Sequence, residues 1–285
     1  MTAPRVWVDG RLLDGAEPSI PALDHGFVVG DGVFEATKIL DGEGFALTRH
    51  HDRMARSLAG LGLPPADRGW FADGIRAVLA AGEPIAFGKL RWWVTGGVGP
   101  LGSDRGPAGM PSAPVHVVAA EAIDRPPPTT AVSVVPWTRN ERAATAGLKT
   151  TSYADNVVAL AAARRAGASE AIFANTRGEL CEGTGSNVFV VVDGDILTPS
   201  LDAGPLPGVT RDLVITWCRR AGLPVHERRL PLSVLFSADE VFLTSSTRDV
   251  QPVTTVDDRL LPAGPVTARA AEAFRAGLAQ DGIDP

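Results

Sequence analysis

The order of strands and helices constrains the fold of this chain more than any single motif does. Short apolar strands occur in both halves of the 285 residues, and helical segments interrupt them at irregular intervals. Regular alternation of strand and helix would predict a doubly wound parallel sheet, and this alternation is missing. No internal repeat is evident. The pattern therefore predicts an α+β fold.

The first part of the chain is predicted to be rich in strands. Asp9-Gly10 is a turn dipeptide between alternating residues, which predicts an opening hairpin over 5–13. We also expect a loop at 20–27, strands at 33–40, 45–47, 89–95 and 115–120, helices at 48–61 and 66–81, and a Gly/Pro-rich loop at 96–114.

Three consecutive prolines, Pro126-Pro127-Pro128, resemble a linker. They predict a domain at 1–120, a linker at 121–129 and a second domain at 130–285. In the second domain, Ser152 with Asp155 resembles a capping box that begins a helix ending at Gly167. Further helices are expected from Pro207 and over 266–278, and strands at 130–135, 171–174, 179–181, 188–192, 196–198 and 241–244.

Composition narrows the classes of function. The net charge of −6, with scattered basic residues, gives no reason to expect nucleic acid as a partner. Cys181 and Cys218 form neither a metal spacing nor a disulfide framework, which favours a reducing compartment. The N-terminus has no apolar signal core, and no stretch is long enough to cross a bilayer. These features predict a soluble cytoplasmic protein.

An amine, a phenol and a carboxylate stand at the ends of predicted elements between residues 147 and 187. Lys149 is one of only three lysines, and a partly desolvated lysine can act as a nucleophile, which arginine cannot. Glu182 could keep a pyridine nitrogen protonated, and Tyr153 could donate to a phenolate oxygen. Taken singly, they are also compatible with a surface lysine, a turn carboxylate and a half-buried aromatic residue.

Two segments could hold a phosphate. Gly208-Val209-Thr210 opens a predicted helix, whose first amides and dipole favour an anion. Ser245-Ser246-Thr247 follows a strand and offers hydroxyls and amides in a turn. Arg53 could add a charged donor. Capped helices and Ser-rich turns are common, so each feature alone is weak.

Other classes of site lack their motifs. No Gly-x-Gly-x-x-Gly opens a strand–helix–strand unit, and there is no Walker loop. The histidines show no metal-ligand spacing, and no Gly-x-Ser-x-Gly elbow is present. We therefore expect neither a nucleotide site, nor a metal site, nor a serine nucleophile.

Taken together, six motifs in order resemble the class IV (fold type IV) pyridoxal-phosphate aminotransferases. This family includes branched-chain and D-amino acid aminotransferases and aminodeoxychorismate lyases. The motifs are Asp24-His-Gly-Phe-Val-Val-Gly-Asp-Gly-Val-Phe-Glu, His50-His-Asp-Arg-Met, the Lys149 segment, Cys181-Glu-Gly-Thr-Gly-Ser-Asn-Val-Phe, Leu206-Pro-Gly-Val-Thr-Arg-Asp and Thr244-Ser-Ser-Thr-Arg-Asp-Val-Gln-Pro-Val.

The resemblance implies a small N-terminal α/β domain, a larger C-terminal domain with a mixed, barrel-like sheet, and a homodimer. It implies that pyridoxal 5′-phosphate binds Lys149 as a Schiff-base lysine, with Glu182 at the ring nitrogen and Tyr153 at the O3′ oxygen. It places five residues around the phosphate: Arg53, Val209, Thr210, Ser246 and Thr247.

The substrate-binding residues are less uniform in this family. Gly30-Asp-Gly-Val-Phe-Glu and Thr244-Ser-Ser-Thr resemble the D-amino acid branch, with Phe34 where a tyrosine is frequent. The D-amino acid enzymes and the lyases both carry a loop arginine that binds a carboxylate, and Leu101 replaces it here. Arg91, at an arginine position of branched-chain members, is the first substitute. Further candidates are Arg105, Lys89, Thr247 and Arg248, the last through its backbone amide.

The resemblance therefore predicts a ping-pong transaminase that moves an amino group from a D-amino acid to a 2-oxo acid. Relaxed substrate choice, including primary (R)-amines, would follow from the missing loop arginine. The alternative is an aminodeoxychorismate lyase, which forms 4-aminobenzoate and pyruvate. A binding protein without activity, on an inherited fold, is a third possibility of another class.

Overall fold

The computed structural model describes residues 3–14, 17, 19–106 and 114–285. Residues 107–113 of the predicted Gly/Pro-rich loop lie outside these ranges. Contacts divide the chain into two compact units, of which the first comprises Met1–Arg125, Leu148–Tyr153 and Asp284. The second comprises Pro126–Gly147, Ala154–Ile283 and Pro285. A short excursion that contains Lys149 thus belongs to the first unit.

An antiparallel sheet in the order β2-β1-β6-β5-β3-β4 forms the first unit. Its strands are β1 (Arg5–Val8), β2 (Arg11–Asp14), β3 (Gly32–Leu40), β4 (Glu43–Gly44), β5 (Phe87–Thr95) and β6 (His116–Ala122). The hairpin of β1 and β2 turns at Asp9-Gly10, as predicted. β3 and β5 pair along their whole length, from Gly32 opposite Thr95 to Leu40 opposite Phe87.

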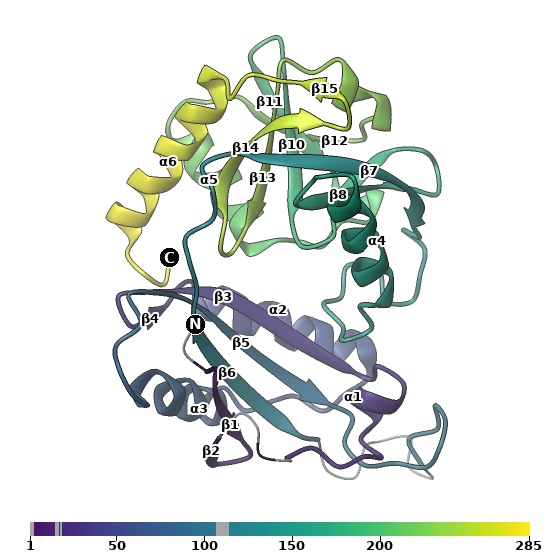
Figure 1. The fold of residues 1–285 in the computed structure, drawn as a ribbon, viewed down its shortest axis with the longest axis vertical. Helices are drawn as coiled ribbons and strands as arrows, with labels where there is room; N and C mark the ends of the chain where they lie inside the picture. Colours follow the sequence, from purple (N-terminus) through teal and green to yellow (C-terminus); the bar gives the residue numbers. More distant parts are fainter. Residues whose placement is uncertain (1–2, 15–16, 18, 107–113) are drawn as a thin grey trace. The chain divides into compact units, whose positions relative to one another are not determined.

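Helices α2 (Leu47–Leu61) and α3 (Arg68–Ala80) cover one face of this sheet, as Figure 1 shows. Every second strand residue faces them, and side chains such as Ile39, Trp92 and Val118 form an apolar core with Met54 and Leu58. The alternate residues Phe34, Arg91 and Trp93 therefore lie on the opposite face. A short helix, α1 (His25–Val28), precedes β3.

The second unit is built on a mixed sheet in the order β12-β11-β10-β13-β14-β7-β8-β9, with β15 paired to β14. Its strands are β7 (Thr130–Arg139), β8 (Glu170–Asn175), β9 (Leu180–Gly183), β10 (Asn187–Val192), β11 (Asp195–Pro199), β12 (Val225–Arg228), β13 (Glu240–Ser245), β14 (Asp249–Val256) and β15 (Arg259–Leu260). β8, β10 and β13 are almost fully buried, and apolar residues fill their central positions.

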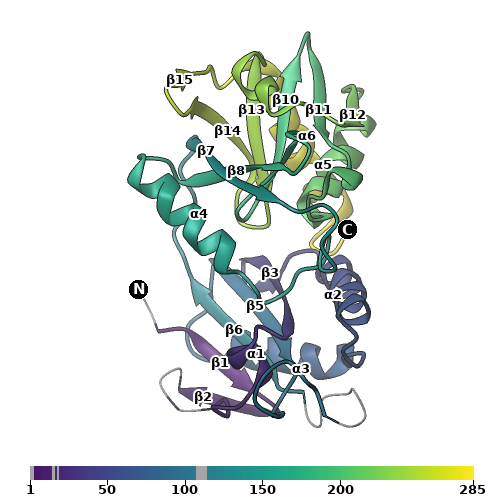
Figure 2. The same ribbon diagram turned by 90° about the vertical axis from the view of Figure 1, so that its right-hand side faces the viewer.

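Three helices and two 3₁₀ turns complete the second unit. The helices are α4 (Ala154–Arg165), α5 (Val209–Arg220) and α6 (Pro265–Asp281), and the 3₁₀ turns are η1 (Leu201–Ala203) and η2 (Leu232–Phe236). α4 packs on β7 and β8 through Ala159 and Ala163, a pairing visible in Figure 2. α5 and α6 pack together, with the Trp217 and Phe274 rings 4.9 Å apart.

The prediction of an α+β fold is confirmed, and three local predictions were wrong. No strand follows the turn at 45–47, because Ala46 is left-handed and α2 begins at Leu47; only Glu43 and Gly44 pair with β3. The loop predicted at 20–27 contains the start of α1. Ser152 does not begin α4 as a capping box; its hydroxyl donates to Gly30 O instead.

Candidate active site

Lys149 is held in the first unit by its backbone. Its carbonyl accepts from Phe34 N at 3.0 Å, and its amide donates to Ser57 Oγ at 3.1 Å. One residue on, Thr150 forms an isolated bridge with Val33. The segment at 148–153 thus runs alongside the first residues of β3 and pairs with them through an isolated bridge. This placement needs two segments more than a hundred residues apart in the chain.

The side chain of Lys149 lies among aromatic rings. Its Nζ donates to the Tyr153 hydroxyl at 3.3 Å and lies 4.4 Å from the centroid of the Phe34 ring. The Phe34 and Tyr153 rings meet edge to face. The Arg91 guanidinium lies 4.0 Å from the same Phe34 ring. The structure therefore brings three of the predicted residues together around the ring of a fourth, Phe34.

A buried cluster fixes Arg53. Its Nε and Nη2 donate to the two oxygens of Glu35 at 2.8 and 2.6 Å, and His50 Nδ1 lies 2.6 Å from Glu35 Oε2. Burial alone would raise the pKa of Glu35, but Arg53 and His50 outweigh it and lower this pKa to about 2. Burial lowers the pKa of His50, so at neutral pH its uncharged ring donates to the carboxylate.

Glu182, on β9 of the second unit, is held by its side chain. One carboxylate oxygen accepts from Leu206 N at 2.9 Å, and the other lies 3.2 Å from Arg139 Nε. Arg139 is itself held, since Nη1 donates to Asn156 Oδ1 at 3.1 Å and its guanidinium lies 4.2 Å from the Phe173 ring. The contacts of Glu182 with Leu206 N and with Arg139 suit an ionised carboxylate in a fixed orientation.

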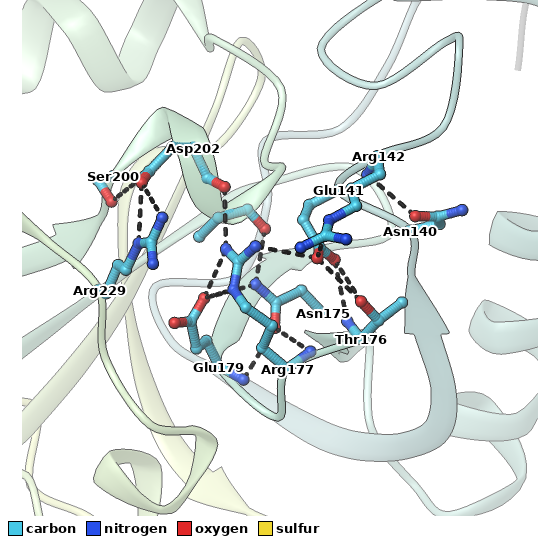
Figure 3. A network of polar contacts seen from close by, with 11 residues as sticks. Asn140, Glu141, Arg142, Asn175, Thr176, Arg177, Glu179, Ser200, Asp202 and Arg229 are labelled. Carbon is cyan, nitrogen blue, oxygen red and sulfur yellow. Dashed lines mark hydrogen bonds and ion pairs between the residues drawn. The ribbon is translucent and has the colours of Figure 1, made fainter.

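A polar network holds the chain directly after Arg139. Figure 3 shows Arg177 between the carboxylates of Glu141 and Glu179; its Nη1 and Nε donate to them, each at 2.9 Å. Glu141 also accepts from the Thr176 amide at 3.1 Å. The network ties the loop after β7 to the turn between β8 and β9. It therefore keeps the end of β7, which carries Arg139, beside the strand of Glu182.

The two predicted phosphate segments flank one residue, Asn187. Asn187 Nδ2 donates to Leu206 O at 2.9 Å, just before α5, and Asn187 pairs with Thr244 at the end of β13. A Cβ on Gly208 would lie 2.0 Å from Asn187 Oδ1, so any larger residue there would displace the Asn187 side chain. The Thr210 hydroxyl is buried and has no hydrogen-bond partner within the described ranges. An anion at the start of α5 would supply that partner.

Ser246 and Thr247 lie, half-buried, in the turn between β13 and β14. Arg248, in the same turn, points elsewhere: Nη2 lies 3.3 Å from Glu170 Oε2, and Nη1 donates to Gln251 Oε1 at 2.5 Å. Its amide donates to Ser245 O at 3.2 Å. Neither its side chain nor its amide is therefore a good candidate for binding a substrate carboxylate.

Two further candidates lie in the first unit. Lys89 is on β5 opposite Lys38, four ladder positions from the pair of Phe34 and Trp93. Arg105 donates with Nε and Nη2 to both oxygens of Asp31, at 2.7 and 2.5 Å. This pairing makes Arg105 a poor candidate for binding a carboxylate. Arg91, which lies nearer to Phe34 than Lys89 does along the ladder, is the better of the two that remain.

Sequence reasoning missed three residues that the structure places next to predicted ones: Glu35, Arg139 and Asn187. Glu35 and Asn187 stand within recognised motifs, and their polar side chains on otherwise apolar strands were an available signal. Arg139 carried no such signal, because it lies in a loop-like stretch of sequence far from Glu182. No group of histidine, cysteine and acidic residues that could hold a metal ion occurs among the residues described.

The donor set fits pyridoxal phosphate. The cofactor needs an amine for its aldehyde, an anion for its ring nitrogen and amide or hydroxyl donors for its phosphate. Lys149 and Glu182 are of the types that would supply the first two, and the unpartnered Thr210 hydroxyl with the start of α5 would supply the third. Lys149 and Arg53 belong to the first unit, and Glu182, Thr210 and Ser246 to the second.

Comparison with known proteins places these features in a family. Residues 32–256 match the model of amino-transferase class IV. A Methanocaldococcus jannaschii protein, named provisionally as a branched-chain-amino-acid aminotransferase, is 31% identical over 280 residues, covering 95% of each chain. The D-alanine aminotransferase of Listeria monocytogenes is 29% identical, covering 95% of this chain and 94% of that protein.

Two more comparisons bear on the reaction. The bifunctional aminodeoxychorismate lyase / D-amino acid transaminase of Mycobacterium tuberculosis is 29% identical and covers 97% of this chain and 99% of its own. The crystal structure of the branched-chain aminotransferase of Thermoproteus uzoniensis with norvaline superposes with a TM-score of 0.87 at 28% identity, covering 98% of this chain and 96% of that chain.

Proposed function

Because the chain belongs to the class IV aminotransferases, which depend on pyridoxal phosphate, we propose that it transfers the amino group of a D-amino acid to a 2-oxo acid. Its fold is that of the fold type IV enzymes, with two curled half-barrel sheets. An amino donor and an oxo-acid acceptor are the substrates of the family. The D-amino acid preference is the proposed part.

When bound, pyridoxal phosphate supplies an aldehyde for the amino group and a protonated ring that accepts electrons from the substrate Cα. Glu182, held by Arg139 and Leu206 N, would keep the ring nitrogen protonated. The start of α5 at Val209 and Thr210, the turn at Ser246 and Thr247, and Arg53 would hold the phosphate. These roles extend the family resemblance residue by residue.

The observation that carries the proposal is the group around the Phe34 ring. Lys149 Nζ and the Arg91 guanidinium lie 4.4 and 4.0 Å from this ring. An amino acid substrate needs both a group that moves a proton at Cα and a cation for its carboxylate. Lys149 would move the proton, with the Tyr153 hydroxyl 3.3 Å away to orient the amine. Arg91 would bind the carboxylate.

The choice of a D-amino acid rests on motifs and relatives. Gly30-Asp-Gly-Val-Phe-Glu and Thr244-Ser-Ser-Thr resemble the D-amino acid branch, and relatives named D-alanine aminotransferase extend over nearly the whole chain. Arg91 and the Methanocaldococcus and Thermoproteus proteins favour branched-chain L-amino acids instead. The two assignments differ in which face of Cα is presented to Lys149, so they predict opposite enantiomers.

A half-reaction screen tests the proposal. Purified protein loaded with pyridoxal phosphate is mixed separately with D-alanine, D-glutamate, L-leucine and (R)-1-phenylethylamine, and the visible absorbance of the cofactor is followed. We expect D-amino acids to convert the cofactor to its amine form at least about tenfold faster than L-leucine. Lys149→Ala is the matched control and should convert with none of them. Faster conversion by L-leucine would refute the D preference.

Relaxed substrate choice follows from the loop, in which Leu101 stands 81% exposed and Arg105 is bound to Asp31. Without a loop cation, Arg91 is the one cation proposed for the carboxylate, so a donor that lacks a carboxylate forfeits one contact and not two. We therefore expect (R)-1-phenylethylamine to react in the same screen, more slowly than D-alanine. No reaction with this amine, alongside rapid reaction of D-alanine, would exclude the relaxed choice.

The second candidate is aminodeoxychorismate lyase activity, which the named activities of the Mycobacterium tuberculosis relative favour. It would use the same lysine and cofactor to release pyruvate. Incubation with aminodeoxychorismate, with pyruvate measured by lactate dehydrogenase, distinguishes the two reactions. Release of pyruvate at a rate above that of D-alanine transamination would make the lyase the principal activity.

A homodimer is part of the proposal. Seven large apolar side chains are exposed on α1, the loop before it and the loop at 96–105: Ile20, Leu23, Phe27, Val28, Val29, Val98 and Leu101. Phe27, at 79% exposed, is too apolar for a solvated surface. A second copy of the chain would cover this patch. Light scattering should give twice the mass of 29.8 kDa, and Phe27→Asp should lower it.

A reducing, cytoplasmic location is also proposed, because Cys181 and Cys218 are both free and buried. Burial raises the pKa of the Cys218 thiol to about 11, so it is not reactive at neutral pH. No helix within the described ranges is long and apolar enough to cross a membrane. Cell fractionation tests the location directly.

A further inference from the structure

We propose that Asp31 and Arg105 are positioning residues. Their ion pair, the latch, fixes loop 96–105 to the segment at 24–32, which contains α1 and the turn before β3. The latch thereby determines which substrates the enzyme accepts. The inference rests on the proposed function, since it takes this loop to contact the substrate. Both segments belong to the first unit.

The Arg105 end of the loop is fixed by its guanidinium. Nε and Nη2 donate to the two oxygens of Asp31 at 2.7 and 2.5 Å. Nη2 also donates to Leu61 O at 2.9 Å and Nη1 to Gly62 O at 3.1 Å, at the carbonyl end of α2. The two side chains are only 18% and 10% exposed. A guanidinium has five N–H donors, so this set leaves little of it for a ligand.

The beginning of the loop is fixed by α1 and its cap. His25 N donates to Gly97 O at 2.8 Å, and His25 Nε2 lies 2.8 Å from Pro100 O. Asp24 forms an isolated bridge with Val98. Gly96 N donates to Asp31 O at 2.7 Å, and a Cβ on Gly96 would lie 2.5 Å from Asp31 Oδ2. Asp31 therefore contacts both ends of the loop.

The same turn also holds the segment of Lys149. Gly30 O accepts from Thr151 Oγ1 and Ser152 Oγ, each at 3.0 Å, and Gly32 O accepts from Thr151 N at 2.8 Å. A cavity of about 490 Å³ lies beside these contacts, lined by Phe27, Trp93, Thr95 and Thr151 among others. The turn thus fixes the loop and the lysine segment relative to each other, and the latch is the charged part of this connection.

The latch explains why a loop without the family's carboxylate arginine still has a defined position. Leu101, 81% exposed, is presented on a segment held on both sides. A loop held in this way can select substrates by shape without contributing charge. Breaking the latch should therefore change substrate binding more than the chemical step.

The experiment compares Arg105→Ala, Asp31→Asn and the double variant with wild-type holoenzyme. Amide hydrogen exchange is measured over residues 96–102, and kcat and KM are measured for D-alanine and several 2-oxo acids. Arg105→Lys tests conservative rescue, because it retains one charged contact with Asp31. Arg76→Ala is the matched control, since it breaks the exposed Arg76–Asp73 pair on α3 of the same unit.

We expect exchange over 96–102 to accelerate about tenfold or more in both single variants, with little further change in the double variant. KM for the 2-oxo acids should rise about fivefold or more, with kcat within about twofold. Arg105→Lys should recover part of the change in KM, and Arg76→Ala should behave as wild type. Unchanged exchange would overturn the latch, and faster exchange with unchanged KM for every substrate would overturn its role in selection.

Failure of the proposed function would look different. A wild-type enzyme that converts neither D- nor L-amino acids would refute transamination and with it the role in substrate selection. The exchange measurement would still decide whether Asp31 and Arg105 hold the loop, because it does not depend on activity.

Discussion

Lys149 and Glu182, the two residues central to the proposed chemistry, are held in opposite ways. Lys149 is anchored by its backbone through Phe34 N and Ser57 Oγ, and within the described residues its amine makes one hydrogen bond, to Tyr153. Glu182 lies on a regular strand, and its side chain is held at both oxygens. A group that must move a proton keeps a movable side chain, whereas a group that must maintain a charge is fixed.

The same contrast exists between the two arginines of the first unit that we propose as ligand contacts. Arg53 is held by two short hydrogen bonds to a buried carboxylate. Arg91 lies on the exposed face of β5 and contacts the Phe34 and Trp93 rings. A phosphate that stays bound suits a rigid partner, and a substrate that must leave suits an adaptable one. Four predictions test this division, in order of decreasing effect.

Lys149→Ala should abolish transamination, with kcat lower by about ten-thousandfold or more, because no other amine can replace the proton-moving group. The backbone contacts that anchor the segment do not involve the side chain, so thermal stability should change little. Stopped-flow absorbance and a melting curve measure the two effects. A large loss of stability would contradict the backbone anchoring.

Glu35→Gln should destabilise the first unit by about 3–5 kcal/mol, because it removes the anion from a buried pair with Arg53. The pKa of Glu35 falls from 4.5 to about 2 on folding, so the wild-type stabilisation is complete above pH 4.5 and is lost as the pH falls toward 2. Urea unfolding at several pH values should show this loss in the wild type and a flatter profile in the variant. Asp73→Asn, which changes an exposed acid, is the control.

Glu182→Gln should lower kcat by about a hundredfold, because a neutral amide does not keep a ring nitrogen protonated. Arg139 would lose its counter-ion but keep Asn156 and the Phe173 ring, so the fold should survive. Arg139→Gln should lower kcat less, since Leu206 N still holds the carboxylate. Kinetics with D-alanine measure both. Equal losses would show that Arg139 has a role beyond holding Glu182.

Tyr153→Phe should have the smallest effect, about three- to tenfold on kcat, because it removes one hydrogen bond to the Lys149 amine. The visible absorbance of the bound cofactor should also shift, since the phenol is expected to contact its O3′ oxygen. An unchanged spectrum with an unchanged rate would remove Tyr153 from the proposed site.

Much of the local structure could be predicted from the sequence, because it depends on residues that are neighbours in the chain. Asp9-Gly10 predicted a hairpin, and a helix was expected over 48–61; both predictions are confirmed. Errors occurred where a distant partner decided the outcome. The Ser152 hydroxyl, a good helix cap by its position, is bonded to Gly30, more than a hundred residues away.

The sequence by itself determined the family, the cofactor and the residue types that the chemistry needs, because each is encoded in short motifs. Only the tertiary structure decided which of these residues contact one another. Arg105 is a candidate for substrate binding in the sequence, and its pairing with Asp31 makes it part of the scaffold. The sequence predicted that residues 148–153 belong to the second domain, over 130–285. In the structure they belong to the first unit, where Lys149 lies against Phe34. Contacts between segments far apart in the chain decide the role of Arg105 and the position of Lys149. The reason is that the free energy of a buried hydrogen bond or ion pair depends on the partner group and its surroundings, which the local sequence does not specify.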